Sequence, residues 1–218
     1  MLDGIDPSSV RSVGLTGQMH GMVALDEKGR VLRPCIMWND QRSYEECAEI
    51  TERIGESEVL RITGNPVLAG FTAPKVLWVQ KNEPEAFARI DKILLPKDYI
   101  RYQLTGDFFT DVSDASGTWL LNVGKRTWSD SLLDSLGWSR QWLPEVTEST
   151  EASAKVSTCG SEATGLPVGT PVIAGGGDCA AQAVGSAIVR EGKVSVTLGT
   201  SGVAVSYTHL TLPTIREV

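Results

Sequence analysis

The segment VIAGGGDCAAQAVG, at residues 172–185, constrains the fold of this chain more strongly than any other segment. An apolar run typical of a buried strand leads into three consecutive glycines and Asp178, and a run of small residues typical of a packed helix follows. A strand that passes directly into a helix is the building unit of an α/β fold. Ligands bind at the carboxyl ends of strands in open α/β sheets, and glycines let a ligand approach the backbone there. The segment therefore predicts a ligand site at Asp178.

The remaining sequence alternates segments with strand periodicity and segments with helix periodicity, so we predict an α/β fold with a largely parallel sheet. Strands are expected at 10–17, around a hairpin turn at 26–29, at 35–38, at 91–95, and on both sides of a glycine turn within 193–206. Helices are expected at 41–55, 72–82, 84–90, 96–106 and 178–189, and residues 107–123 are expected to be rich in loops. Short helical pieces are expected around Trp128, Trp138 and Trp142, with the indole rings in the core.

The helix expected at 41–55 carries an apolar stripe that should face the core. Gly55 suits the C-cap of this helix. The members of the stripe, which recur at helical spacing, are Tyr44, Cys47, Ala48, Thr51 and Ile54.

Composition and charge exclude several classes of protein. The 218 residues are 41% hydrophobic and 22% charged, which is typical of a globular chain with a sizeable core. A formal net charge of −7 and a pI near 4.9 argue against nucleic-acid or anionic-membrane partners, because both would repel the chain. The four cysteines indicate neither a zinc site nor a disulfide framework, so a reducing cytoplasm is expected. The sequence shows neither a membrane-spanning apolar run nor a signal peptide.

Two other interpretations of the glycine segment stay open from the residues alone. Asp178 could act only as a helix N-cap, which stabilises a helix by about 1 kcal/mol but does not explain three preceding glycines. Gly175-x-Gly177-x-x-Ala180 also matches the pattern of a dinucleotide site. Such a site needs an acidic residue at the end of the next strand, and the strand expected here ends in Leu198. Nicotinamide chemistry is therefore a minor alternative.

Two further glycine-containing motifs could complete a site. LGTSG, residues 198–202, puts the hydroxyls of Thr200 and Ser201 in a turn whose N–H groups could hold a phosphate, although a plain hairpin turn is the simpler explanation. GQMHG, residues 17–21, combines hydrogen-bonding side chains with an apolar methionine, which suits a polyol. For His20 alone, a histidine with satisfied hydrogen bonds is the simpler interpretation.

Seven segments, taken in order, make the chain resemble the FGGY family of carbohydrate kinases, and in particular its xylulose-phosphorylating branch. They are GLTGQMHG, RPCIMWND, ITGNPVLAGFTAPKVLWVQKNEP, LLPKDYIRYQLTG, SDASGT, GGGD and TLGTSG, and the resemblance covers residues 10–206. It implies an incomplete ribonuclease-H-like domain of the actin and hexokinase ATPase type, followed by the first hairpin of a second such domain. Residues 1–187 would be the N-terminal sugar-binding domain without its first strands, 188–206 the start of the ATP-binding domain, and 207–218 a tail that does not match the family.

The resemblance also implies an activity, which is the ATP-dependent phosphorylation of D-xylulose at its 5-hydroxyl, with Mg2+ accompanying the ATP. Phosphoryl transfer requires the protein mainly to position the reactants and to accept a proton, which a carboxylate can do. The implied partners are the sugar and ATP, without nucleic acid or membrane, and a homodimer is compatible with the family. No side chain is assigned to a metal. The implied roles are Asp178 as the general base, Met19 and His20 as sugar contacts, and Gly199, Thr200 and Ser201 as the ATP phosphate turn.

Two departures from the family pattern affect these expectations. Cys179 stands where the family typically has an asparagine, and a thiol is a weaker hydrogen-bond donor than an amide, which bears on sugar identity. No glycine turn of the DxGT type precedes Val10. We therefore expect the chain to be an interior fragment that does not turn over ATP by itself.

Two alternative functions remain at this stage. A sister kinase could act on gluconate, ribulose or glycerol, and the glycerol branch would present an Arg-Glu pair in place of Met19 and His20. A sugar-binding module without catalysis is the alternative from a different class, and the presence of Asp178 argues mildly against it.

Overall fold

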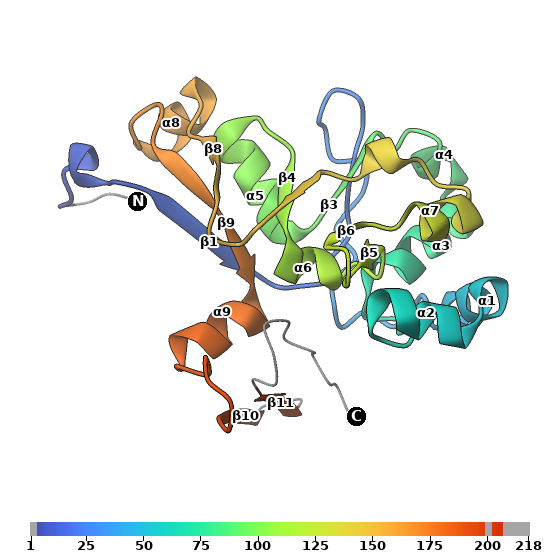
Figure 1. The fold of residues 1–218 in the computed structure, drawn as a ribbon. Helices are drawn as coiled ribbons and strands as arrows, with labels where there is room; N and C mark the ends of the chain where they lie inside the picture. The colour runs from blue at the N-terminus through green and yellow to red at the C-terminus, as the bar shows by residue number, and fades with distance from the viewer. Residues whose placement is uncertain (1–3, 199–201, 207–218) are drawn as a thin grey trace.

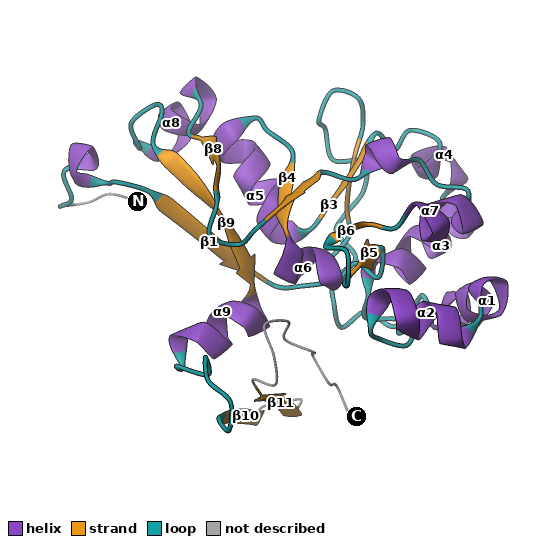
Figure 2. Cartoon of the chain, viewed as in Figure 1, coloured by secondary structure: helices purple, strands orange, loops and turns teal. Residues whose placement is uncertain are grey.

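The computed structural model describes residues 4–198 and 202–206 (Figure 1). Strands and short helices alternate along it (Figure 2). The strands are β1 (Val13–Gly17), β2 (Val23–Leu25), β3 (Lys92–Leu94), β4 (Phe109–Asp111), β5 (Leu121–Asn122), β6 (Thr127–Trp128), β7 (Glu145–Thr147), β8 (Ala152–Lys155), β9 (Pro171–Gly177), β10 (Val194–Leu198) and β11 (Gly202–Ser206). The helices are α1 (Tyr44–Ile54), α2 (Glu56–Thr63), α3 (Thr72–Asn82), α4 (Pro84–Phe87), α5 (Pro96–Thr105), α6 (Val112–Ser116), α7 (Asp130–Leu136), α8 (Thr158–Thr164) and α9 (Asp178–Gly185), with 3-10 turns η1 (Pro7–Ser9) and η2 (Arg140–Trp142).

A three-stranded sheet in the order β1-β9-β8 forms one end of the molecule. Helices α1 to α4 and α7 gather at the other end, with α5 and α6 between the two parts (Figure 1). Helix α9 continues directly from β9 and leads to the β10–β11 hairpin, which lies apart from the sheet (Figure 1). The carboxyl ends of β1 and β9 therefore meet beside the start of α9.

The pairing of β1 with β9 contains a β-bulge. Both strands run in the same direction, but β9 uses one residue more than β1 between the second and third matched pairs. The matched pairs are Val13 with Val172, Gly14 with Ile173, Thr16 with Gly176, and Gly17 with Gly177.

The prediction of a largely parallel sheet was wrong. Among the described strands, only β1–β9 and β4–β7 pair in parallel, and the other pairings are antiparallel. Alternation of strands and helices along a chain does not determine which strands become neighbours, and several of these strands, such as β5 and β6, are two residues long and form local hairpins.

The largest core lies in the helical part of the molecule. Ile50 of α1, Val76 of α3, Leu132 of α7 and the ring of Trp119 are all fully buried there. None of the described helices is long and apolar enough to cross a lipid bilayer.

The three tryptophans expected in this core are there. Trp128 and Trp138 are buried, and Trp142 is half-buried against the core. Their local structures differ from the expected helical pieces, because Trp128 lies in strand β6 and Trp138 follows the C-cap of α7, whereas Trp142 ends the 3-10 turn η2.

Two predicted helices agree closely with the structure. Helix α3 has the predicted bounds, and α5 ends where Gly106 takes a left-handed conformation and donates its N–H to the carbonyl of Tyr102. The turn predicted at 26–29 is also confirmed, since Gly29 has φ +72° and its N–H donates to the carbonyl of Asp26. Glycine and proline residues at the ends of these elements are sufficient to define where they begin and end.

The predicted buried stripe of α1 was right in part. Cys47 and Ile54 pack against the core and Thr51 is half-buried, whereas Tyr44 is 74% exposed and Ala48 is exposed. The side chains that are fully buried are those of Glu46 and Ile50, which the prediction did not include. The carboxylate of Glu46 pairs with the ammonium of Lys81 at 2.9 Å, and this contact with α3 orients the helix. A polar residue is buried here because its charge is paired.

Two other local predictions need correction. Residues 35–38 form no strand, and Ile36 makes only an isolated bridge to Met22. Residues 107–123, expected to be rich in loops, contain strand β4, helix α6 and strand β5. Helix α6 is only five residues long, and Asp111 caps it by accepting the N–H of Ser113 at 2.9 Å. An Asp cap makes so short a helix possible without a periodic pattern.

Candidate active site

The loop after β1 holds His20 in a backbone conformation that is uncommon for residues other than glycine. Its φ is +70°. Two buried donors hold its carbonyl oxygen, which accepts hydrogen bonds from the Lys75 ammonium at 2.8 Å and the Thr72 hydroxyl at 3.1 Å. Left-handed conformations outside glycine persist where the surrounding structure holds them, and they cluster at functional sites.

The side chains of Met19 and His20 lie against the backbone of Gly117. The imidazole Nδ1 of His20 is 2.7 Å from the Gly117 carbonyl oxygen, and the ring meets the edge of Phe71 with its centroid 4.7 Å away. A Cβ atom at Gly117 would lie 2.7 Å from His20 Nδ1 and 3.0 Å from Met19 Cε. His20 is 5% exposed, which agrees with the simpler interpretation of a buried histidine with a satisfied hydrogen bond.

The glycines of β9 are needed for contacts within the chain itself. Gly175 has φ +77°, and a Cβ there would lie 1.9 Å from the carbonyl oxygen of Leu15 on β1. A Cβ at Gly177 would lie 2.6 Å from Met19 Cγ. The prediction from sequence was that these glycines let a ligand approach. Two of the three have a packing reason instead, because they allow the bulge and the contact with Met19.

Asp178 is the first residue of α9, and its side chain is exposed. The N-cap of the helix is Gly177, so the interpretation of Asp178 as an N-cap was wrong. Its carboxylate oxygen Oδ1 accepts the N–H of Cys179 at 2.8 Å. Asp178 thus directly follows the bare backbone of Gly177, against which Met19 packs.

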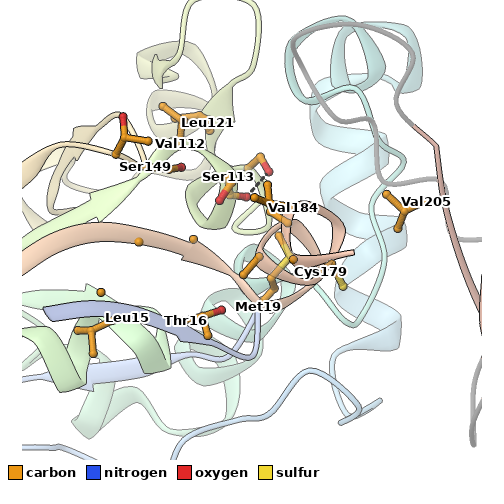
Figure 3. A pocket seen from close by; sticks show the side chains of 18 of the residues that line it. Leu15, Thr16, Met19, Val112, Ser113, Leu121, Ser149, Cys179, Val184 and Val205 are labelled. Carbon is orange, nitrogen blue, oxygen red and sulfur yellow. Dashed lines mark hydrogen bonds between the residues drawn. The ribbon is translucent and has the colours of Figure 1, made fainter. Parts of the chain in front are cut away.

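A cavity of about 680 Å3 opens between the ends of β1 and β9, helix α6 and helix α9. Figure 3 shows Met19, Ser113 and Cys179 around it, from the loop after β1, from α6 and from α9. Among the described residues that line it, neither His20 nor Asp178 is included, so these two side chains lie at or beyond its margin. The lining residues include Thr16, Met19, Ser113, Ser149, Gly176 and Cys179.

A buried charge cluster behind this cavity has no counterpart in the sequence predictions. The ammonium of Lys97, which is fully buried, lies 2.7 Å from Asp98, 2.8 Å from Asp111 and 3.7 Å from Asp114. It also donates to the carbonyl of Ala174 on β9 at 3.3 Å. We call the three carboxylates the aspartate cluster. The segment PKDYIR contained a signal, because its three charged residues directly follow a buried strand and charged side chains need partners when they are buried.

Members of the aspartate cluster have opposite pKa shifts. Burial raises the pKa of Asp114 well above its ordinary value, and the neighbouring charge of Asp98 raises it further, as does that of Asp178. Burial also acts to raise the pKa of Asp111, but the Lys97 charge and hydrogen bonds outweigh it, so this pKa is lowered. The surroundings therefore favour the charged form of Asp111 and disfavour the charged form of Asp114.

The predicted ATP phosphate turn lies outside the described residues. Gly199, Thr200 and Ser201 connect β10 to β11, and these two strands form the antiparallel hairpin that the sequence predicted. The predicted tail at 207–218 also lies outside the described residues. Across the described ranges, no group of three or more histidine, cysteine or acidic side chains is arranged to hold a metal ion.

Comparison with known proteins defines the class of this domain. The model of the FGGY family of carbohydrate kinases, N-terminal domain, matches residues 2–185. A xylulose kinase from Escherichia coli (strain K12) is 48% identical over 206 residues, which cover 94% of this chain and 42% of the relative. The structure of a xyloylose kinase from Brucella ovis superposes with a TM-score of 0.85 at 46% identity, covering 91% of this chain and 40% of that one. A gluconate kinase from Lactobacillus acidophilus reaches 0.83 at 26% identity, covering 90% and 40%.

The fold is therefore that of an α/β, ribonuclease-H-like ATPase domain, as the resemblance predicted. The chain belongs to the FGGY family of carbohydrate kinases. It spans about 42% of the length of the E. coli relative. The family match ends at residue 185, and the division at residue 187 between two domains stays a prediction.

Proposed function

We propose that this chain supplies the sugar-binding part of a kinase that transfers phosphate from ATP to the 5-hydroxyl of D-xylulose. The observation that carries the proposal is the convergence of Met19 with the glycine backbone that presents Asp178, in a chain similar to proteins named xylulose kinase. The sugar would lie at the meeting point of the loop after β1 and the start of α9.

Asp178 would act as the general base. As the 5-hydroxyl oxygen attacks the terminal phosphorus of ATP, the carboxylate accepts the hydroxyl proton, and the bond from phosphorus to the ADP oxygen breaks. The products are the phosphorylated ketose, ADP and a protonated Asp178 that returns its proton to water. The exposed position of the carboxylate supports this role, because a substrate hydroxyl can reach it.

Met19 and His20 would contact the sugar. The methionine offers an apolar surface for the C–H groups between the hydroxyls, and the imidazole offers hydrogen-bonding capacity on a ring whose Nδ1 faces Gly117. The left-handed backbone of His20 supports a functional role for the turn, since the structure fixes it with two buried donors.

The nucleotide would meet the sugar from the side of the β10–β11 hairpin. Gly199, Thr200 and Ser201 would bind its phosphates, and residues 188–206 would begin the ATP-binding domain. Mg2+ would enter with the nucleotide, because this ion is commonly held by substrate phosphates and only one or two carboxylates. The described residues fit this arrangement better than an all-protein metal site, since no acidic cluster open to an ion is present among them.

The cellular setting is a further part of the proposal. A reducing cytoplasm and a role in xylose metabolism agree with the cysteine content and with the names of the relatives. A homodimer remains compatible with this function.

A sister sugar kinase is the second candidate. The gluconate kinase similarity favours it, although at 26% identity against 46–48% for the xylulose-kinase relatives. Cys179 is half-buried and lines the cavity. Its thiol could therefore change which sugar is preferred among xylulose, ribulose, gluconate and glycerol. A non-catalytic sugar-binding module is the third candidate.

A hybrid enzyme tests the proposal. Residues 10–206 replace the aligned segment of the E. coli relative, and ADP formation is measured with each of the four sugars. We expect D-xylulose to give the highest kcat/KM. Asp178→Asn should lower kcat at least ~100-fold, because a lost general base contributes about that much. Asp130→Asn is the matched control, since Asp130 is also the exposed first residue of a helix, α7.

Each outcome distinguishes the candidates. A higher kcat/KM with another sugar would favour the sister kinase. Sugar binding without ADP formation would favour the module. Equal rates for Asp178→Asn and the unmodified hybrid would refute the assignment of the base.

A further inference from the structure

Ser113 links the end of β9 to the aspartate cluster. Its hydroxyl donates a hydrogen bond to the Asp111 carboxylate and accepts the backbone N–H of Gly177 at 3.2 Å. A hydroxyl can do both at once, because it has one proton and two lone pairs. The same oxygen would lie 3.2 Å from a Cβ at Gly176, so Ser113 packs directly on the bare glycine backbone.

The Asp111 carboxylate, which receives this hydroxyl, is held firmly by several other donors. Lys97 contacts one of its oxygens at 2.8 Å, and the Ser149 hydroxyl contacts the other at 2.8 Å. The N–H of Ser113 also reaches the second oxygen at 2.9 Å. Asp111 is fully buried, so these contacts act where solvent does not weaken them. A fixed carboxylate in turn fixes the rotamer of Ser113.

The start of α9 depends on this anchor more than the start of a typical helix does. Its N-cap, Gly177, provides no side-chain hydrogen bond to the first turn. Within α9 only Ala183 is buried, so the helix has little apolar packing that could fix its position. The hydrogen bond from Gly177 to Ser113 is thus a specific contact directly before the residue that carries the carboxylate.

We propose that Ser113 is a positioning residue for the proton acceptor, because it fixes the backbone from which Asp178 projects. The effect of Ser113 on catalysis rests on the proposed function, whereas its hydrogen bond to Gly177 does not. Ser113 itself does not exchange a proton with the sugar. It transmits the rigidity of the buried Lys97–Asp111 pair to Gly177 and thereby limits the positions that the Asp178 carboxylate can take.

Backbone hydrogen exchange in the 218-residue chain tests the anchor without any activity assay. Ser113→Ala removes the acceptor, so the N–H of Gly177 should exchange about tenfold faster, as expected when one hydrogen bond of ordinary strength is lost. Ser113→Thr keeps the hydroxyl and should restore slow exchange. Ser135→Ala is the control, because the Ser135 hydroxyl donates to the carbonyl of Ser131 on the exposed side of α7. Circular dichroism checks that each variant is folded.

Kinetics of the hybrid enzyme test the catalytic part. Ser113→Ala should lower kcat roughly 10- to 100-fold with little change in the KM for the sugar, because displacing a reactive group by about an ångström reduces rates on this scale. In an Asp178→Asn background the same change should have almost no further effect, because Ser113 acts through Asp178. A general loss of structure would instead lower both backgrounds equally.

The outcomes separate this inference from the proposed function. Unchanged exchange at Gly177 in Ser113→Ala overturns the anchor. Faster exchange with unchanged kcat, or a full additional loss in the Asp178→Asn background, overturns the positioning role. If the unmodified hybrid forms no ADP with any sugar, the proposed function and the catalytic part fail together, whereas the exchange result still decides whether the anchor exists.

Discussion

Two fully buried lysines support the site in different ways. Lys97 lies among the aspartate cluster, where its charge is opposed by carboxylates. Lys75 donates to the neutral carbonyl oxygens of His20 at 2.8 Å and Gly70 at 2.6 Å. The first lysine joins α5 to β4, α6 and β9, and the second joins α3 to the loop after β1 and to the backbone of Gly70.

The difference teaches what each buried charge is suited to do. Carboxylates around an ammonium give a strong but interdependent network, in which loss of the cation leaves several charges unpaired. An ammonium that donates to backbone carbonyl oxygens stabilises one backbone conformation. Loss of the cation then removes a hydrogen-bond donor from each of these carbonyl groups. We therefore expect Lys97 to determine whether the domain folds and Lys75 to determine whether the loop after β1 keeps its shape.

The largest expected effect is that of Lys97→Met. The aspartate cluster would lose the cation that contacts its carboxylates directly and would keep only the charge of the neighbouring buried Arg101. Breaking a buried ion pair in this way costs roughly 3–5 kcal/mol of the free energy of unfolding. Urea denaturation followed by circular dichroism measures the loss. Lys125→Met, at an exposed turn, is the control and should change stability by less than ~0.5 kcal/mol. A loss below 1 kcal/mol for Lys97→Met would remove the distinction between the two lysines.

A smaller loss is expected for Lys75→Met, about 1–3 kcal/mol, because the carbonyl oxygens of His20 and Gly70 each lose a donor. In the hybrid enzyme this variant should raise the KM for D-xylulose, since the His20 backbone at positive φ loses one of its two buried donors. Equal KM values for the variant and the parent would show that the turn keeps its shape without Lys75.

The smallest effect, with the opposite sign, is expected for Asp114→Asn. Because the folded-state pKa of Asp114 is raised, its contribution to stability is present below the unfolded-state pKa of about 3.9 and is lost as the pH rises through the folded-state value. Asparagine has no charge to bury. The variant should therefore gain stability relative to the parent between pH 5 and pH 8, measured by thermal unfolding at each pH.

Asp134→Asn, at an exposed position of α7, serves as the control for this pH series. Its difference from the parent should not vary with pH. A loss of stability by Asp114→Asn at pH 8 would mean that the charged form of Asp114 is the one that the lysine needs.

The sequence predicted elements whose signals are local. Helix α3, the end of α5 at Gly106 and the β10–β11 hairpin follow from periodicity, proline and glycine, all within a few residues. The family resemblance and the fold class were confirmed by the comparisons. The assignment of Asp178, Met19 and His20 stays a prediction, although the structure does bring Met19 to the strand end that carries Asp178.

The features that could not be predicted depend on contacts between distant segments. The partners of Lys97 include Asp111 and Ala174, which lie in other elements. Their spacing in the sequence does not predict that they contact Lys97. The burial of Glu46 on α1 was missed for the same reason, because Lys81 of another helix makes it favourable. Strand neighbours and side-chain networks are properties of the assembled fold.

The bulge in β9 has a geometrical consequence for Asp178. Side chains alternate between the two faces of a strand, and Val172 and Ala174 point into the core. Without the bulge, this alternation would place Gly177 on the face opposite to Val172 and Ala174. The extra residue on β9 shifts the alternation by one, so Gly177 is buried like them, and Asp178 follows directly as the exposed first residue of α9. The bulge therefore lets β9 carry one residue more than β1 and still present its acid to water.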